Sequence, residues 1–221
     1  MWIKICANTN LEDTLLATSL GANAVGFVFA PSPRRVTAQQ VAAITPHLPS
    51  TVERVGVFHS SNADEIVATI NTAGLTAAQL HGGVDLSLAT QLHQIFRGRI
   101  KLIQTIHWIV EPGSSSVEAV RQQLQQIATH PALHHVLVDS KVGKSLGGTG
   151  VTFPWAEARA VFAEFAPQLN IIVAGGLRPE NVAAAIQQLH PWGVDVASGV
   201  EIQAGQKDPQ KLADFIRIAR S

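Results

Sequence analysis

Short apolar runs alternate along this chain with longer segments whose apolar residues recur at helical spacing. The runs predict eight strands, at Ile3–Cys6, Ala24–Phe29, Arg54–Phe58, Ala77–Leu80, Ile100–Thr105, His135–Asp139, Asn170–Ala174 and Val194–Ala197. The intervening segments predict eight helices, at Leu11–Leu20, Ala38–His47, Ala63–Ala73, Leu86–Ile95, Val117–Ile127, Pro154–Phe165, Pro179–Leu189 and Pro209–Arg220. No linker or low-complexity stretch interrupts this alternation.

Several of the predicted helices have a start signal in the residues before them. Thr9 and Glu12 fit a capping box, and Thr37 and Asn62 are candidate N-caps. Asp208 is a candidate N-cap that is followed by proline in the first helical turn.

Eight strand–helix units at a spacing of roughly 27 residues match the α/β class and the (β/α)8 TIM barrel, which typically needs about 250 residues. We therefore expect a single barrel domain over residues 1–221. The alternative is an open doubly wound sheet, which would normally have fewer strands. Its dinucleotide-binding form has GxGxxG after the first strand, where this chain has CANTN.

Composition excludes several classes of partner. The chain has 221 residues, 46% of them hydrophobic, and a formal net charge of zero, so it lacks the basic surface that nucleic acids require. No apolar stretch approaches the length of a membrane span. One cysteine cannot form an internal disulfide, and the start of the chain has no signal-type segment. We expect a cytoplasmic protein without a nucleic-acid or membrane partner.

Two strand ends carry candidate catalytic groups. Because side chains alternate along a strand, Lys4 and Cys6 should face the barrel interior, and Ile3 and Ile5 the covering helices. Cys6 and Asp139 then lie at the carboxyl ends of their strands, where barrel active sites are built. A thiol and a carboxyl group there could form an acid–base pair. A buried core thiol and a loop-capping aspartate remain the alternatives.

Other strand ends suggest binding groups. The last two strands end in VAGGL and VASGV, where Gly175, Gly176, Ser198 and Gly199 let backbone N–H groups approach a phosphate. Plain turns are the alternative reading of these glycines. In FAPSPRRVT, two prolines stiffen a loop that aims a guanidinium, and Arg34 is a candidate clamp for a carboxylate. No His, Cys, Asp or Glu cluster has metal-ligand spacing, so we expect no metal.

A series of motifs runs along the chain: KICANTNLED, AVGFVFAPSPRRVT, VGVF, QLHG, LVDS, GGTGVTFPW, AGGLRPENV and VDVASGVE followed by KDP. In their order and spacing, these motifs resemble those of phosphoribosylanthranilate isomerase of tryptophan biosynthesis. The resemblance implies an isomerase of aromatic amino-acid biosynthesis that carries out an Amadori rearrangement without a cofactor. It implies that Asp139 is the acid, Cys6 the base and Arg34 the ligand of the anthranilate carboxylate, while the two glycine-containing turns hold the phosphate. The partner would be a small phosphorylated substrate, and the protein a monomer or homodimer.

The chain departs from the family pattern directly after the proposed base. Relatives usually read KICGIT, whereas this chain has Ala7 and Asn8 after Cys6. We expect Ala7 to adopt an ordinary negative φ and the enzyme to be active.

Two other functions remain as alternatives. The chain could be a catalytically silent relative that binds a sugar phosphate, or another phosphosugar isomerase, such as that of histidine biosynthesis. The histidine-pathway family places an aspartate at the end of the first strand, and Cys6 argues against it. A protein that only binds a partner and has no catalytic activity is the least favoured alternative, because its polar groups would have to meet at the mouth of the barrel by chance.

Overall fold

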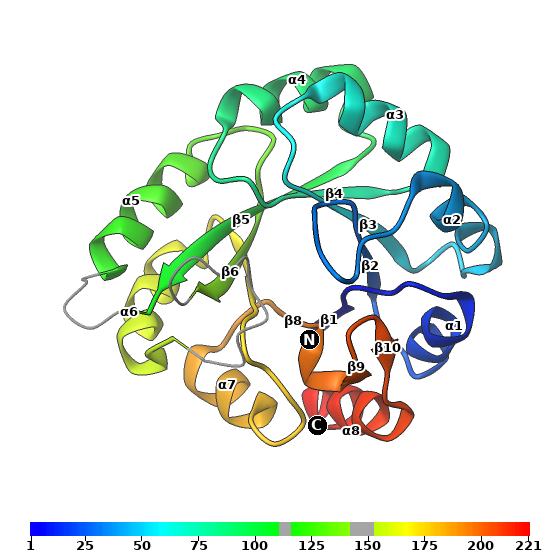
Figure 1. Cartoon of the computed structure of the whole chain (residues 1–221). Helices are drawn as coiled ribbons and strands as arrows, with labels where there is room; N and C mark the ends of the chain where they lie inside the picture. The colour runs from blue at the N-terminus through cyan, green and yellow to red at the C-terminus, as the bar shows by residue number, and fades with distance from the viewer. Residues whose placement is uncertain (111–115, 142–152) are drawn as a thin grey trace.

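The computed structural model describes residues 1–110, 116–141 and 153–221. Within them, eight parallel strands close into one barrel in chain order, surrounded by helices (Figure 1). The strands are β1 Trp2–Ile5, β2 Ala24–Val28, β3 Glu53–Phe58, β4 Ala77–Leu80, β5 Lys101–Ile109, β6 His135–Lys141, β7 Asn170–Val173 and β8 Gly193–Val196. The predicted TIM barrel is confirmed.

The helices alternate with these strands as predicted. They are α1 Leu11–Ser19, α2 Ala38–Ala42, α3 Ala63–Ala73, α4 Leu86–Phe96, α5 Ser116–Ala128, α6 Trp155–Phe165, α7 Val182–Leu189 and α8 Pro209–Arg220. Two short 3-10 helices, η1 Thr45–His47 and η2 Ser198–Val200, and a small hairpin of β9 Glu201–Gln203 and β10 Gln206–Lys207 complete the fold. The glycine-rich stretch 143–150, which contains the start of the GGTGVTFPW motif, lies outside the described residues.

The predicted boundaries differ from the observed ones for local reasons. The segment predicted as one helix from Ala38 divides into α2 and η1, and a proline stands in the first turn of η1. Strand β5 runs beyond its predicted end at Thr105 to Ile109, because β6 continues to pair with it. The helix predicted from Pro179 begins at Val182.

Three predicted N-caps are confirmed and one is wrong. The side chains of Thr37, Asn62 and Asp208 accept hydrogen bonds from backbone N–H groups in the first turns of α2, α3 and α8. The N-cap of α1 is Asn10, whose side chain accepts from the N–H of Asp13, and not Thr9. The Thr9 hydroxyl instead donates to the carbonyl oxygen of Gly205 in the β9–β10 hairpin.

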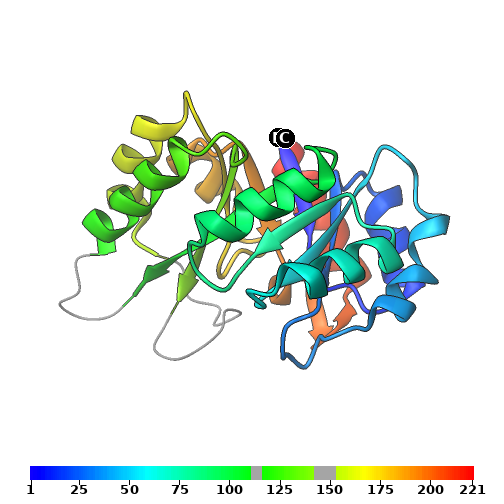
Figure 2. The same ribbon diagram turned by 90° about the horizontal axis from the view of Figure 1, so that it is seen from above.

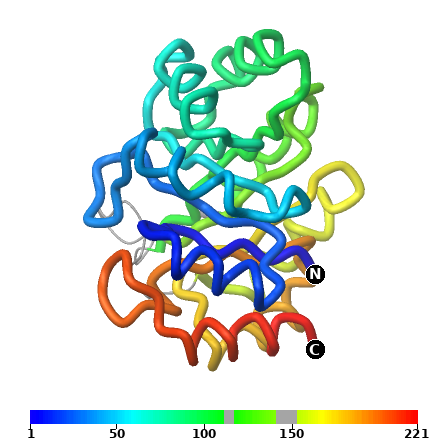
Figure 3. Tube along the Cα trace, turned by 90° about the vertical axis from the view of Figure 1, so that its right-hand side faces the viewer, coloured from blue at the N-terminus to red at the C-terminus, as the bar shows by residue number. Residues whose placement is uncertain are grey.

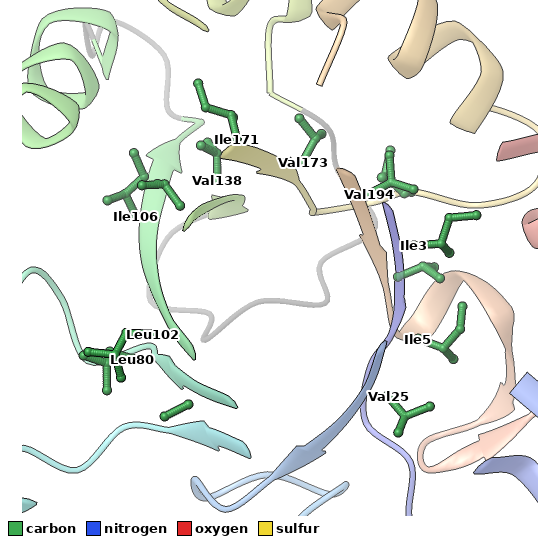
Figure 4. Packing of buried hydrophobic residues seen from close by; sticks show 14 of the residues in the cluster. Ile3, Ile5, Val25, Leu80, Leu102, Ile106, Val138, Ile171, Val173 and Val194 are labelled. Carbon is green, nitrogen blue, oxygen red and sulfur yellow. The ribbon is translucent and has the colours of Figure 1, made fainter. Parts of the chain in front are cut away.

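The apolar core has two parts, as the alternation along a strand requires. Ile3, Ile5 and other strand residues point away from the barrel axis and pack under the helices (Figure 4). A smaller cluster fills the barrel interior, and it consists of Trp2, Ala24, Val55, Ala77, Ile103, Leu137, Ile172 and Ala174. The predicted outward orientation of Ile3 and Ile5 is confirmed.

Both chain termini lie at one end of the barrel (Figures 2 and 3). The chain enters β1 directly from Met1, so this is the end at which the parallel strands begin. The carboxyl ends of all eight strands therefore meet at the opposite end. No helix in the described parts of the chain is long and apolar enough to cross a membrane.

Candidate active site

A pocket of about 470 Å³ opens among the carboxyl ends of the strands. Its wall includes Cys6, Arg34, His81, Asp139 and Asp195. Both predicted catalytic residues and the predicted carboxylate clamp therefore line one cavity, although they come from distant parts of the sequence.

Cys6 follows the last residue of β1, and 7% of its surface is exposed. Its N–H donates to the carbonyl oxygen of Val196 on β8, at 2.8 Å. The neighbouring strand leaves room for the thiol, because a Cβ atom at Gly26 would lie 2.8 Å from Cys6 Sγ. Gly26 is thus required by the close approach of the side chain beside it.

A buried ion pair lies next to the thiol. Lys4 is fully buried, and its Nζ donates to Asp195 Oδ1 at 2.8 Å. Burial raises the pKa of Cys6, and Asp195 raises it further, while the Lys4 and Lys207 ammonium groups oppose this change. Burial lowers the pKa of Lys4, but Asp195 and Cys6 outweigh that effect and raise it. Lys4 therefore remains charged and able to stabilise a thiolate.

The pKa of Asp139 is raised to about 7. Burial is the largest cause, and the negative charge of Asp195 adds to it, while Lys4 and a backbone hydrogen bond from Ser140 act in the other direction. A carboxyl group with this pKa holds its proton in much of the population at neutral pH. Asp139 thus has the property that a general acid needs.

The predicted phosphate-binding residues also come together. Gly175, Gly176, Ser198 and Gly199 line a second, smaller pocket of about 60 Å³ beside the first, and Asp139 lines both. A side chain at Gly199 is excluded, since its Cβ would lie 1.9 Å from the carbonyl oxygen of Leu177. Gly199 lies in η2, and the first N–H groups of a helix have no partner within it.

Arg34 is held by a residue that the sequence analysis missed. Its Nε donates to Glu201 Oε1 and Oε2 at 3.0 and 2.9 Å, and its Nη2 donates to Oε2 at 2.7 Å. Burial raises the pKa of Glu201, but the hydrogen bonds from Arg34 and the charge of Lys207 lower it overall. Glu201 is therefore an ionised partner that fixes the guanidinium at the pocket wall.

Lys207 is a second residue that the analysis missed. It lies in β10 and is 1% exposed, and its Nζ donates to the carbonyl oxygen of Cys6 and to Glu201 Oε1. Lys207 Nζ also donates to the carbonyl oxygen of Ala197, directly after β8, so the hairpin connects the ends of β1 and β8. In the sequence, Lys207 stands out only as part of the VDVASGVE…KDP motif, and the motif does not indicate which residues the lysine contacts.

The prediction that Ala7 has a negative φ is wrong. Its φ is +61°, in the left-handed region, and the residue is 1% exposed. An L-residue with a Cβ atom adopts this conformation at a cost of about 1–2 kcal/mol. The next residue, Asn8, donates hydrogen bonds to the carbonyl oxygens of Ile5 and Gly26, which lie on the two strands beside this turn.

Three residues could hold a divalent cation. His81 follows β4, His107 lies on β5 and Asp139 on β6, and one ligand atom of each lies within 4.8 Å of the others. Two imidazoles and a carboxylate suit zinc or iron(II). Spacing along the sequence does not reveal this group, because its three residues come from the ends of different strands.

A family model described as N-(5'phosphoribosyl)anthranilate (PRA) isomerase matches residues 3–218. The chain belongs to this family. An N-(5'-phosphoribosyl)anthranilate isomerase from Pelobacter propionicus is 40% identical over 219 residues, covering 99% of this chain and 95% of that protein. The isomerase from Thermotoga neapolitana is 37% identical, covering 99% and 98% of the two chains.

Solved structures of the isomerase family agree with this assignment. Phosphoribosyl anthranilate isomerase from Thermotoga maritima has a TM-score of 0.82 and 32% identity, covering 100% of this chain and 98% of that one. A family structure in complex with reduced 1-(o-carboxyphenylamino)-1-deoxyribulose 5-phosphate has a TM-score of 0.79 and 30% identity, with the same coverage. The family resemblance of the sequence motifs is confirmed.

Proposed function

We propose that this isomerase-family chain converts N-(5′-phosphoribosyl)anthranilate into 1-(2-carboxyphenylamino)-1-deoxyribulose 5-phosphate in L-tryptophan biosynthesis. The supporting observation is that Cys6 and Asp139 line one pocket, with a smaller glycine-lined pocket beside it. The larger pocket has room for the aromatic ring and the ribose, and the smaller one suits the phosphate. Family membership supplies the identity of the reaction.

The first step uses Asp139 as the acid. Its carboxyl proton passes to the ribose ring oxygen as the bond from that oxygen to C1′ breaks. The bonding electrons go to the oxygen, which becomes a hydroxyl group, and the anthranilate nitrogen donates its lone pair to C1′. The product is a ring-opened iminium ion beside an Asp139 carboxylate, and the pKa of about 7 lets this group release its proton.

The second step uses Cys6 as the base. The positive iminium makes the C2′ hydrogen acidic, so the thiolate can remove it, and the C–H electrons form a C1′–C2′ double bond. The iminium π electrons return to nitrogen and neutralise it. The resulting enolamine gains a proton at C1′ and loses its O2′ proton to give the ketone. The charge of nearby Lys4 favours the thiolate that begins this step.

Arg34 is expected to bind the anthranilate carboxylate. Arg34→Lys keeps the charge but loses the planar fork, so KM should rise about tenfold with a smaller change in kcat. Steady-state kinetics of this variant and of Arg34→Ala test the role, with Arg35→Ala as the matched control, because Arg35 is adjacent and exposed. If Arg35→Ala impairs KM and Arg34→Ala does not, the assignment is wrong.

One assay tests the function as a whole. Phosphoribosylanthranilate is unstable and is generated in situ, and its turnover is compared with that of the histidine-pathway aminoaldose under the same conditions. We expect turnover of the anthranilate compound with strong preference over the other substrate. Binding of the product analogue without turnover would instead identify a catalytically silent relative.

The remaining expectations concern the protein's surroundings. The proposed partner is the small phosphorylated substrate, in the cytoplasm. Among the related proteins, the isomerase from Thermotoga maritima is dimeric. For this chain, monomer and homodimer both remain predictions, and sedimentation equilibrium separates them.

A further inference from the structure

The connection between β1 and α1 contains a left-handed residue in an unusual place. Three non-glycine residues in the described part of the chain have positive φ: Ala7, Arg97 and His190. Arg97 and His190 are the C-caps of α4 and α7, where left-handed residues are common. Ala7 ends no helix and directly follows Cys6, so its conformation has to be enforced by surrounding contacts.

Asn8 makes hydrogen bonds on both sides of this turn. It is fully buried, and its backbone N–H donates to the carbonyl oxygen of Gly26 at 2.9 Å. Its side-chain nitrogen donates to the carbonyl oxygens of Ile5 at 2.8 Å and Gly26 at 3.2 Å. Both acceptors are carbonyl oxygens, so only the nitrogen of the amide can face them. The side chain thus bridges the end of β1 to β2 across the Ala7 turn.

The backbone of Cys6 is held on its other sides as well. Its N–H donates to Val196 of β8, and its carbonyl oxygen accepts from Lys207 Nζ. Strand β1 ends at Ile5, so regular pairing with β2 does not fix this residue. Two groups of Asn8, its backbone N–H and its side-chain amide, attach this segment to β2 through the Gly26 carbonyl oxygen.

We propose that Asn8 is a positioning residue for Cys6: its buried amide holds Ala7 in the left-handed conformation and thereby fixes the strand end that carries the thiol. The inference rests on the proposed role of Cys6 as the base. A residue that served stability alone would change the unfolding temperature without changing the thiol. A positioning residue changes both.

Asn8→Leu tests this, because leucine is similar in size and has no donor. We expect kcat to fall about tenfold or more with KM changed by less than about threefold, since small displacements of a reacting group are costly. Cys6 is the only cysteine of the chain, so alkylation with iodoacetamide over a pH series reports on this thiol alone. The pH midpoint of alkylation should shift in the variant. If Asn8→Leu does not fold, Asn8→Ala allows the same measurements.

A second substitution provides a rescue. Glycine adopts positive φ without the cost of a Cβ atom, so Ala7→Gly should make the turn independent of the Asn8 amide. In the Asn8→Leu background, Ala7→Gly is expected to restore kcat to within about threefold of the wild type. Alone, Ala7→Gly should raise the unfolding temperature by about 2–4 °C and change kcat by less than about tenfold.

Thr45→Val is the matched control. Thr45 is buried in η1, does not line the pocket, and donates its hydroxyl to the carbonyl oxygen of Ala73 at 2.9 Å. Its loss should lower the unfolding temperature and leave kcat and alkylation unchanged. The proposal is overturned if Asn8→Leu behaves like this control, or if glycine at position 7 gives no rescue. A wild type inert on phosphoribosylanthranilate would contradict the proposed function, while the alkylation profiles would still decide the role of Asn8.

Discussion

Replacing Cys6 with serine is expected to lower kcat by about 10³-fold, because a hydroxyl is far less ionised than a thiol and makes a much weaker base. The substitution is close to isosteric, and the pocket around Cys6 is already lined by polar groups. The fold should therefore survive, and the loss should appear in turnover. Steady-state kinetics with substrate generated in situ, together with thermal unfolding of the same preparation, measure both effects.

A chemical experiment on the unmodified sequence checks the same role. Since the chain has one cysteine, stoichiometric alkylation modifies Cys6 alone, and activity should disappear in proportion to the fraction modified. The product analogue should protect the thiol, because Cys6 lines the pocket. Near-normal turnover by Cys6→Ser, or by the fully alkylated protein, would remove Cys6 from the mechanism.

The eight strands could be predicted because strands buried on both faces read as continuous apolar runs. Their ends were harder to predict where polar residues belong to a strand. His107 interrupts the apolar pattern of β5, yet it pairs with Asp139 of β6 inside the ladder. Similarly, the choice of Asn10 over Thr9 as the N-cap depends on the contact of Thr9 with Gly205, which a local pattern does not contain.

The site was predictable only to the extent that it follows from single strands. The alternation of side chains along a strand predicts that Lys4 and Cys6 face the barrel interior. The positions of the strand ends predict that Asp139 and the glycines lie at the same end of the barrel. The residues that these groups contact are brought to them only when the barrel closes. Lys4 and Asp195 are 191 residues apart in sequence, and Arg34 and Glu201 are 167 apart, so no spacing rule connects them.

Ala7 shows a different limit of the sequence. Alanine gives no local signal for positive φ, and its side chain predicts the ordinary region. The residues on either side of Ala7 are held by distant groups: Asn8 donates to carbonyl oxygens of β1 and β2, and the Cys6 carbonyl oxygen accepts from Lys207, 201 residues further along the chain. A backbone conformation imposed by tertiary contacts in this way could not be inferred from the residue itself.

The pKa values of the two reacting groups are in an unusual order. The pKa of Asp139 is about 7, and burial raises the pKa of Cys6 above its ordinary value, so the base has the higher pKa of the two. The productive form, with a thiolate and a protonated carboxyl group, is therefore a minor species at every pH. Its population is proportional to the thiolate fraction multiplied by the protonated fraction of Asp139, and this product determines the pH dependence of kcat/KM.

That product gives three regions. Below about pH 7 Asp139 stays protonated, so kcat/KM rises with the thiolate fraction. Between the two pKa values, each gain in thiolate is cancelled by an equal loss of protonated Asp139, and the profile is flat. Above the pKa of Cys6 the thiol is already ionised, so only the loss of protonated Asp139 continues and kcat/KM falls. The break near pH 7 therefore reports the titration of Asp139.

Asp139→Asn should lower kcat/KM by about 10³-fold at neutral pH, because an amide has the shape of the carboxyl group but no proton to transfer. The residual kcat/KM of the variant should rise with the thiolate fraction of Cys6 through pH 7, without the change of slope expected for the wild type. The substrate phosphate also titrates near pH 6, so the comparison is between the two proteins over the same substrate and pH series. A wild-type break that persists unchanged in the variant would assign it to another group.

The stability of the same variant provides a test that does not depend on turnover. The pKa of Asp139 is raised from 3.8 to about 7 on folding, so between these values the native state binds more protons than the unfolded state. Wild-type stability from this group is therefore fully present below about pH 4 and is lost as the pH rises to 7. Asparagine does not titrate, so the unfolding temperature of Asp139→Asn should increase relative to wild type across this interval. If the difference in unfolding temperature between Asp139→Asn and wild type is the same at pH 4.5 and pH 8, the pKa of Asp139 is not raised by folding. Asp139 is then already ionised in the native pocket at neutral pH and cannot be the acid that opens the ribose ring.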